Sequence, residues 1–262
     1  MDQIKDKNVM ITGAARGLGY KYAEFILRNG AKCVALIDLS TSPGQKSAET
    51  LEQEFGKGKA IFFPCDMTKQ DQVKEIFKKV VEKLNGLDIL INNAGMLNES
   101  KMELTIDLNT TSLIFATLTA MDYMGKHKGG NGGTIVNIAS ILGLMPLAAI
   151  PVYTASKFAV IGFCRSIQEY SKKTGIRFLV MCPGITTTPL VDAAPENAFE
   201  LITAQKVKEV LATLPLQKTE IVAQAMVDLI QKGENGAVWV SENSQAPYAI
   251  KFEHYSKLAV PV

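Results

Sequence analysis

NVMITGAARGLG, residues 8–19, is the stretch that decides the fold. A short apolar run, typical of a buried strand, leads directly into a loop that carries Gly13, Gly17 and Gly19 in a G-x3-G-x-G spacing. Glycines allow a tight turn and let backbone N–H groups approach a pyrophosphate at the start of a helix. They would also fit an ordinary strand-to-helix turn. The position after the first strand and at the opening of a helix favours a nucleotide-binding loop.

Strand and helix patterns alternate along the rest of the chain. Continuous apolar runs predict strands at residues 8–13, 33–38, 60–66, 87–92, 133–140, 176–184 and 237–241. Helical patterns predict helices over residues 18–29, 44–55, 70–84, 103–125, 152–173, 197–214 and 219–233. Strands that are apolar on both faces and alternate with helices form parallel sheets covered on both sides. We therefore expect an α/β fold, a Rossmann-type doubly wound parallel sheet of about seven strands with helices on both faces.

We expect a single domain over residues 1–262, because no repeat, linker or low-complexity tract divides the chain. Its least regular part, residues 186–218, follows the carboxyl end of a predicted strand and is the expected cover of a substrate site. The net charge of +2 gives no nucleic-acid surface. No apolar run is long enough for a membrane span. Four widely spaced cysteines without metal-site spacing, and a start without a signal-peptide pattern, indicate a cytoplasmic protein.

Asp38 ends the second predicted strand, 19 residues after Gly19. A carboxylate at this place accepts hydrogen bonds from adenosine ribose hydroxyls and repels a 2′-phosphate, so it favours NAD over NADP. Arg16 in the glycine loop, two residues before Leu18, could instead meet a 2′-phosphate. We give Asp38 the greater weight, because a buried carboxylate facing a phosphate is costly.

Two more strand ends supply candidates for cofactor binding. Asp66, with Met67 after it, ends the third strand, where it can meet the adenine edge; an N-cap of the next helix explains Asp66 equally well. Asn93, Ala94 and Gly95 follow the fourth strand. Small and amide residues there suit close approach of the adenosine ribose, although turn chemistry at a strand end also selects such residues.

Three polar residues predict the chemistry. Ser140 ends the fifth strand, Tyr153 follows 13 residues later, and Lys157 lies four residues beyond Tyr153. Residues four apart share a helix face, so the ammonium can approach the phenol and should lower its pKa. The same spacing would also arise if Tyr153 were only a core residue and Lys157 only packed its apolar stem beside it. The upstream nucleotide loop and Ser140 favour the other interpretation, in which Tyr153 is a base that deprotonates an alcohol.

Together these motifs, in this order, resemble the short-chain dehydrogenase/reductase family over residues 5–240. The resemblance implies that Asn109, in DLNT, kinks the long helix and holds a water molecule for proton relay. It completes a catalytic tetrad with Ser140, Tyr153 and Lys157, and implies that Lys157 also binds the nicotinamide ribose. By the same resemblance, the nicotinamide and its carboxamide lie near Pro183, Gly184, Ile185 and Thr188.

Within that family the chain is similar to NAD-dependent 15-hydroxyprostaglandin dehydrogenases and to insect-type alcohol dehydrogenases. Prostaglandin dehydrogenases have glutamines where Ala149 and Ile150 stand here, which makes a more apolar wall together with Leu142, Leu144, Met145 and Leu147. We expect a small hydrophobic alcohol or ketone as substrate, NAD as cofactor, and a homodimer, or a tetramer, on resemblance. The alternatives are an NADPH-dependent carbonyl reductase and a non-catalytic binding or storage protein of the same fold. His254 in the C-terminal tail has no predicted role.

Overall fold

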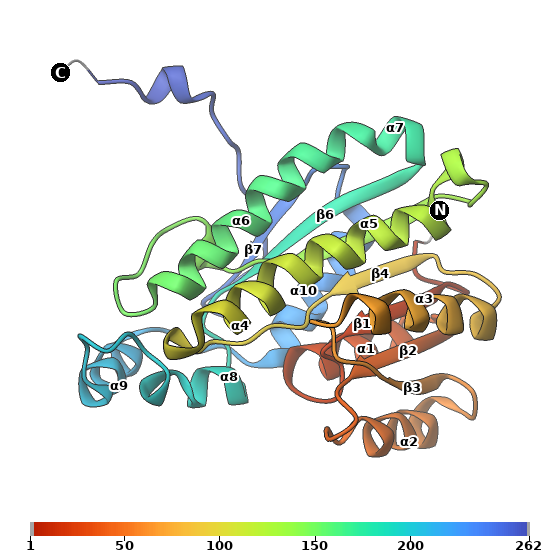
Figure 1. The fold of residues 1–262 in the computed structure, drawn as a ribbon, viewed down its shortest axis with the longest axis horizontal. Coiled ribbons are helices and arrows are strands. Elements are labelled where there is room, and N and C mark those ends of the chain that lie inside the picture. Colours follow the sequence, from red (N-terminus) through yellow and green to blue (C-terminus); the bar gives the residue numbers. More distant parts are fainter. Residues whose placement is uncertain (1–2, 261–262) are drawn as a thin grey trace.

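The computed structural model describes residues 3–260, so the predicted domain ends at residues 1 and 262 lie outside the described residues. These residues form one eight-stranded sheet in the order β3-β2-β1-β4-β5-β6-β7-β8 (Figure 1). The strands are β1 Asn8–Thr12, β2 Cys33–Asp38, β3 Ala60–Pro64, β4 Ile89–Asn92, β5 Gly133–Ile138, β6 Ile176–Pro183, β7 Val238–Ser241 and β8 Tyr248–Ala249. β1 to β7 pair in parallel, which confirms the predicted doubly wound sheet.

The two outer strands of the sheet differ. β8 is a two-residue antiparallel strand on the free side of β7, and it was too short to be predicted from periodicity. β3 pairs with β2 and ends at Pro64, which has no N–H to donate.

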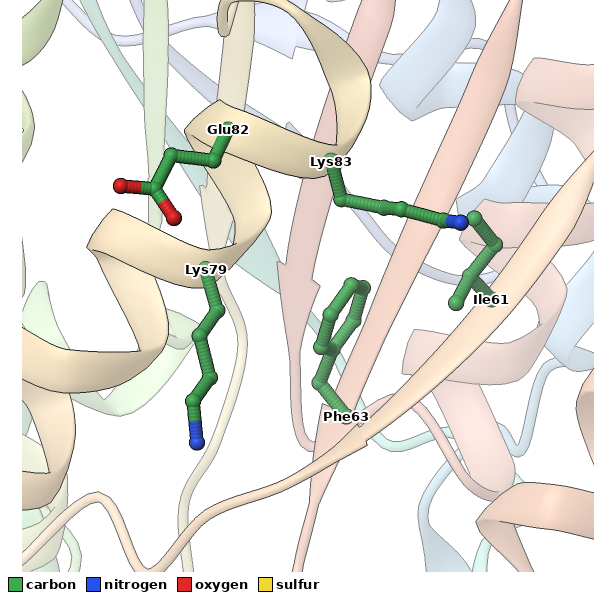
Figure 2. Close-up of a pocket in the computed structure, with 5 residues that line it drawn as sticks. All are labelled: Ile61, Phe63, Lys79, Glu82 and Lys83. Carbon is green, nitrogen blue, oxygen red and sulfur yellow. The ribbon is translucent and has the colours of Figure 1, made fainter.

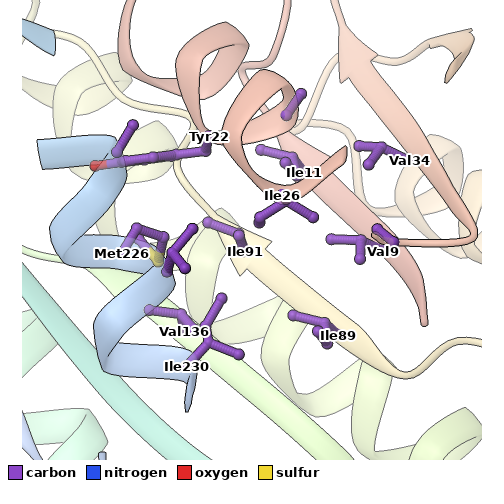
Figure 3. Packing of buried hydrophobic residues seen from close by; sticks show 14 of the residues in the cluster. Val9, Ile11, Tyr22, Ile26, Val34, Ile89, Ile91, Val136, Met226 and Ile230 are labelled. Atoms are coloured by element: carbon purple, nitrogen blue, oxygen red, sulfur yellow. The ribbon is translucent and has the colours of Figure 1, made fainter. Parts of the chain in front are cut away.

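Helices cover both faces of the sheet (Figure 1). The α-helices are α1 Gly17–Arg28, α2 Gly44–Phe55, α3 Gln70–Leu84, α4 Met102–Ile106, α5 Ser112–Met124, α6 Pro151–Ile167, α7 Ser171–Thr174, α8 Pro189–Asp192, α9 Ala204–Thr213 and α10 Thr219–Lys232. Side chains of α1, α2 and α10 pack on one face in a core that includes Leu51. Tyr22 of α1 and Met226 of α10 belong to the same core (Figure 3). On the other face, α3, α5 and α6 bury residues such as Phe77 and Ala116. Both faces are thus sealed, as apolar strands require.

Three predicted helices end or break differently from the prediction. The predicted helix 103–125 is divided into α4 and α5 by a π-helical turn, Asp107–Thr111. The predicted helix 152–173 is α6 followed by a 3-10 turn, Gln168–Tyr170, and α7. The predicted helix 197–214 was wrong at its start: α9 begins at Ala204, because the Thr203 side chain accepts a hydrogen bond from the N–H of Lys206 and caps it there.

The loops that follow the parallel strands meet at one edge of the sheet. The glycine loop follows β1, Asp38 ends β2, the Asn93–Gly95 loop follows β4, Ser140 follows β5 and Gly184 follows β6. α8 and α9, which belong to the predicted cover segment, lie beyond this same edge (Figure 1). Ligands bind at the carboxyl edge of such sheets, so the fold brings the predicted site residues to the expected place.

Candidate active site

The glycine loop is held against the loop after β4. Gly13 and Gly17 have positive φ angles of 64° and 58°, which other residues rarely adopt. A Cβ on Gly13 would lie 2.8 Å from the Cα of Ala94, and one on Gly19 would overlap the carbonyl oxygen of Gly13. The Asn93 side chain donates hydrogen bonds to the carbonyls of Thr12 and Gly13, each at 3.0 Å. Asn93 therefore shapes the loop through its side chain, and its cofactor contact stays a prediction.

Asp38 faces the glycine loop at the carboxyl end of β2. Its Oδ2 accepts a hydrogen bond from the N–H of Ala15 at 2.9 Å, and its Oδ1 accepts one from Leu39 at 2.8 Å. Beside it lies an open groove of about 340 Å³, lined by Ala15, Arg16, Gly17, Tyr20, Pro43, Lys46, Ser47 and Thr50. The groove thus has two basic side chains in its wall, and one of its lining residues, Ala15, binds the Asp38 carboxylate. Leu18 lies half-buried in the first turn of α1.

The structure gives Asp66 and Met67 local roles. Asp66 Oδ1 accepts hydrogen bonds from the N–H and the hydroxyl of Thr68, at 3.0 and 2.8 Å, which holds the turn before α3. The alternative that Asp66 is the N-cap of the next helix was wrong, because Lys69 is the N-cap residue of α3. Met67 is buried in the core under α3. A contact of either residue with a cofactor stays a prediction.

Ser140, Tyr153 and Lys157 come together at the carboxyl end of β5. All three are buried. The Lys157 ammonium donates a hydrogen bond to the carbonyl of Ile138 at 3.0 Å and lies over the Tyr153 ring, 5.6 Å from its centroid. Ser140 lies close enough to hydrogen-bond the phenol. The predicted serine, tyrosine and lysine therefore form one cluster on α6 and the end of β5.

The pKa values of this cluster differ from the prediction made from the sequence. Burial raises the pKa of Tyr153 to about 12, and the hydrogen bond with Ser140 opposes this only in part. Burial also lowers the pKa of Lys157 to about 8. The expectation that Lys157 makes the phenol more acidic was wrong for the protein without cofactor, because burial is the largest influence on the pKa of Tyr153 and the opposing influence comes from Ser140.

Asn109 lies in the π-helical turn, as the family resemblance implied for a kink in the long helix. Its Oδ1 accepts a hydrogen bond from the N–H of Met96 at 2.8 Å, and its Nδ2 donates to the carbonyl of Met96 at 2.8 Å and to Ser156 Oγ at 3.1 Å. A Cβ on Gly95 would lie 3.2 Å from Asn109 Oδ1 and 3.7 Å from Lys157 Nζ. The side chain of Asn109 thus joins the loop after β4 to α6, and its water binding stays a prediction.

The loop after β6 is fixed by residues far along the chain. Pro183 ends β6, and the N–H of Gly184 donates to the carbonyl of Ser241 at 2.8 Å. The carbonyl of Ile185 accepts from the N–H of Gln217 at 3.0 Å. Thr188 is the N-cap residue of α8. Gln217, whose side chain also donates to Thr186 and to the carbonyl of Ser241, was not predicted to matter, since no motif marks it.

An apolar cluster surrounds Tyr153 and joins α6 to the predicted cover segment. Its buried members are Leu97, Ile150, Tyr153 and Ala194, with Leu142, Leu147, Ala149, Leu190, Ala198 and Leu211 packed against them. Four of the six residues predicted to form an apolar wall are in this cluster. The other two are elsewhere: Leu144 packs on the core that α6 forms with β6 and β7, and Met145 is 63% exposed.

Glu99 is a second residue that sequence reasoning missed. Its carboxylate accepts hydrogen bonds from the N–H groups of Val152 and Tyr153, at 2.8 and 2.9 Å, although it lies 53 residues before Val152. One signal was available. Ile150, just before Pro151, has no side-chain acceptor to cap the helix, so an acceptor had to come from elsewhere.

A groove of about 460 Å³ lies away from this site, between β3 and α3, lined by Ile61, Phe63, Lys79, Glu82 and Lys83 (Figure 2). None of the predicted site residues lines it. In the part of the chain that the structure describes, no cluster of histidine, cysteine or acidic residues could hold a metal ion. Nor does any helix within residues 3–260 have the length and apolar character needed to cross a membrane.

Comparisons with known proteins identify the family. Residues 7–198 match the family model described as short chain dehydrogenase. The 15-hydroxyprostaglandin dehydrogenase (NAD(+)) of Rattus norvegicus is 39% identical over 241 residues, which cover 90% of each chain. Alcohol dehydrogenase 1 of Ceratitis cosyra is 34% identical over 241 residues, which cover 91% of this chain and 92% of that protein.

Among solved structures, the NADPH-dependent 3-quinuclidinone reductase from Rhodotorula rubra superposes with a TM-score of 0.79. It is 24% identical, and the match covers 93% of this chain and 92% of that chain, so it supports the fold alone. The family match spans most of the sequence and includes the glycine loop, Ser140, Tyr153 and Lys157. The protein is an oxidoreductase that belongs to the short-chain dehydrogenase family.

Proposed function

We propose that the protein oxidises a hydrophobic secondary alcohol with NAD, which gives the ketone. The observation that carries this proposal is the buried cluster of Ser140, Tyr153 and Lys157 beside an apolar wall, at the carboxyl edge of the sheet. Residues 1–262 act in this proposal as one domain whose segment 186–218 covers the substrate.

The residues present fit a dinucleotide. Gly13 and Gly19 let the glycine loop pack where a Cβ would collide with the backbone of Ala94 or of Gly13, and the Cβ position of Gly17 is nearly free, with Thr188 3.9 Å away. Such a tight glycine turn at the start of a helix is what a pyrophosphate requires. We propose that Gly13, Arg16, Gly17, Leu18 and Gly19 hold the pyrophosphate side. Further along the cofactor we propose contacts with Asp38, Asp66, Met67, Asn93, Ala94, Gly95, Tyr153, Lys157, Pro183, Gly184, Ile185 and Thr188.

NAD is preferred to NADP in this proposal because of Asp38. Its carboxylate is fixed by the N–H groups of Ala15 and Leu39, so it keeps its place at the adenosine end of the groove. A 2′-phosphate there would meet a fixed negative charge. The related prostaglandin dehydrogenase also has NAD(+) in its name.

Each residue of the cluster has a part in the proposed reaction. When bound, a nicotinamide supplies the hydride acceptor. Tyr153 accepts the proton of the alcohol as a base, and Ser140 donates a hydrogen bond to the substrate oxygen. Lys157 places its positive charge over the Tyr153 ring, where it favours the phenolate once the cofactor's own positive charge is added. Asn109 holds the loop after β4 against α6 and, through its backbone, a water for proton relay.

The substrate is proposed to be hydrophobic because the wall around Tyr153 is apolar. Leu142, Leu147, Ala149 and Ile150 reach it from the loop after β5, and Leu190 and Leu211 reach it from the cover segment. An alcohol with an apolar body would bury surface there, whereas a charged group would lose its water without a partner.

Replacement of Tyr153 by phenylalanine tests the mechanism, because it removes the hydroxyl and keeps the ring. We expect turnover of secondary alcohols, measured by NADH absorbance, to fall by roughly 10²–10⁴-fold. NAD binding, measured by calorimetry, should stay within a few-fold of wild type. A variant that keeps near-normal turnover would refute Tyr153 as the base.

An NADPH-dependent carbonyl reductase is the second candidate, favoured by the two basic side chains, Arg16 and Lys46, that line the groove. The ratio of the NAD and NADP dissociation constants decides between the two. A non-catalytic binding protein is the third candidate, and NAD binding without turnover on any alcohol in a panel would support it.

We also propose a homodimer in the cytoplasm. Leu118 and Tyr123 on α5 and Phe158 on α6 are exposed apolar residues, and a partner subunit would cover them. The four cysteines are unpaired and buried, as in a reducing compartment.

A further inference from the structure

The carboxylate of Glu99 holds the first turn of the catalytic helix. It accepts one hydrogen bond from the N–H of Val152 at 2.8 Å and another from the N–H of Tyr153 at 2.9 Å. These are two of the donors that an α-helix leaves unpaired at its N-terminus. Glu99 is 7% exposed, so water does not replace these bonds.

The helix cannot cap itself. Its N-cap residue is Ile150, whose side chain accepts nothing, and Pro151 follows at the first helical position. Among residues 3–260 no salt bridge of Glu99 is found. Its carboxylate faces the N-terminus of α6. A carboxylate at a helix N-terminus is stabilised by the helix dipole.

The same turn is attached to the segment that covers the site. The N–H of Glu99 donates to the carbonyl of Asn197 at 2.9 Å, and the Asn98 side chain donates to the Asn197 side chain at 2.7 Å. A further bond joins the N–H of Phe199 to the carbonyl of Ala149 at 2.9 Å. The cover segment and the start of α6 are therefore tied together through residues 98 and 99.

We propose that Glu99 is a positioning residue for the dehydrogenase reaction: it fixes the first turn of α6 and so places the Tyr153 phenol between Ser140 and Lys157 with the cover segment closed over it. This role rests on the proposed function. Glu99 binds the backbone of Tyr153 and is not itself the base.

Replacement of Glu99 by glutamine tests this role, because the side chain keeps its size but an NH₂ group replaces one of the two acceptors. We expect kcat to fall by roughly 10- to 100-fold, the effect of a displacement of about 1 Å at a reacting group. The NAD dissociation constant should stay within about twofold, since the glycine loop and Asp38 are untouched. Glu99→Asp, which keeps the charge, should recover part of kcat. Glu103→Gln, on the exposed face of α4, is the matched control and should behave as wild type.

The outcomes separate this role from a purely structural one. A cap that only stabilises the fold would lower the melting temperature of E99Q while the folded enzyme keeps the wild-type kcat and pH profile, and this result would overturn the inference. Loss of NAD binding in E99Q would overturn it too. If the wild type turns over no alcohol, the proposed function fails and the positioning role fails with it; an active wild type with an unchanged E99Q refutes the positioning role alone.

Discussion

Lys157 is the residue for which stability and activity should change in opposite directions. We predict that Lys157→Met raises the stability of the cofactor-free protein at pH 7 while it removes the proposed activity. Methionine has a similar length and no charge, so it leaves the core around α6 filled. The lysine is buried, with one hydrogen bond to the carbonyl of Ile138 and its ammonium over the Tyr153 ring.

The magnitude follows from the pKa. Burial lowers the pKa of Lys157 from 10.5 to about 8, which at about 1.36 kcal/mol per pKa unit costs the folded protein about 3 kcal/mol when the lysine is charged. The variant also loses the hydrogen bond to Ile138, which costs about 1–2 kcal/mol. The net gain at pH 7 is then about 1–2 kcal/mol. For a chain of this size it corresponds to a rise in Tm of roughly 2–8 °C.

The sign of the effect depends on pH. Because the folded-state pKa lies below that of the unfolded chain, the cost of the buried ammonium is complete below pH 8 and disappears as the pH rises toward 10.5. The wild type therefore gains stability relative to the variant over this range. Above it, only the lost hydrogen bond to Ile138 remains, and the variant should be the less stable protein.

Thermal and urea unfolding of both proteins without cofactor, at pH 7 and at pH 10, measures this difference, because bound NAD would add its own stabilisation. Lys78→Met, which removes an exposed lysine on α3, is the control and should show no such pH dependence. A K157M variant that is less stable than wild type at pH 7, by an amount that is the same at pH 10, would refute the reasoning.

Three further outcomes are expected. Asp38→Asn should weaken NAD binding about tenfold and narrow the preference over NADP, since a charged acceptor is lost; unchanged dissociation constants for both cofactors would count against Asp38 as the selecting residue. Gly19→Ala should lower the free energy of unfolding by about 1–3 kcal/mol and abolish NAD binding, because its Cβ would overlap the carbonyl of Gly13. The control Gly162→Ala, which has open space at its Cβ, should have neither effect. A thiol reagent at pH 8 should label almost no cysteine in the native protein and all four after unfolding. The reason is that burial raises the pKa of Cys33 and Cys65 to about 11 and the pKa of Cys164 and Cys182 to about 12.

The sheet could be predicted because each parallel strand is a continuous apolar run ended by a polar or glycine residue, as in Val34–Asp38. Ser140, Tyr153 and Lys157 could be placed together for a related reason: a strand end fixes the serine, and helical spacing fixes the other two. Such local patterns specify the path of the backbone, and this path brings the three side chains to the carboxyl edge of the sheet.

Other features of the site could not be predicted, because they depend on contacts between distant parts of the chain. Nothing near Glu99 or Gln217 in the sequence shows that they bind α6 or the loop after β6, since the partners lie 53 and about 30 residues away. The pKa of Tyr153 was predicted in the wrong direction because spacing reveals the nearby lysine but not the depth of burial, and burial dominates. β8 was not predicted, because a strand of two residues shows no periodicity in the sequence.

The two outer strands of the sheet bear on how the protein behaves when concentrated. An open strand edge is a template for pairing with another chain and for the growth of fibres. Here the β7 side is sealed by Tyr248 and Ala249, and the β3 side stops at a proline that cannot extend a ladder. The segment after Ser241 therefore covers the otherwise free edge of β7, and we expect a chain shortened before Tyr248 to expose that edge to pairing with another chain.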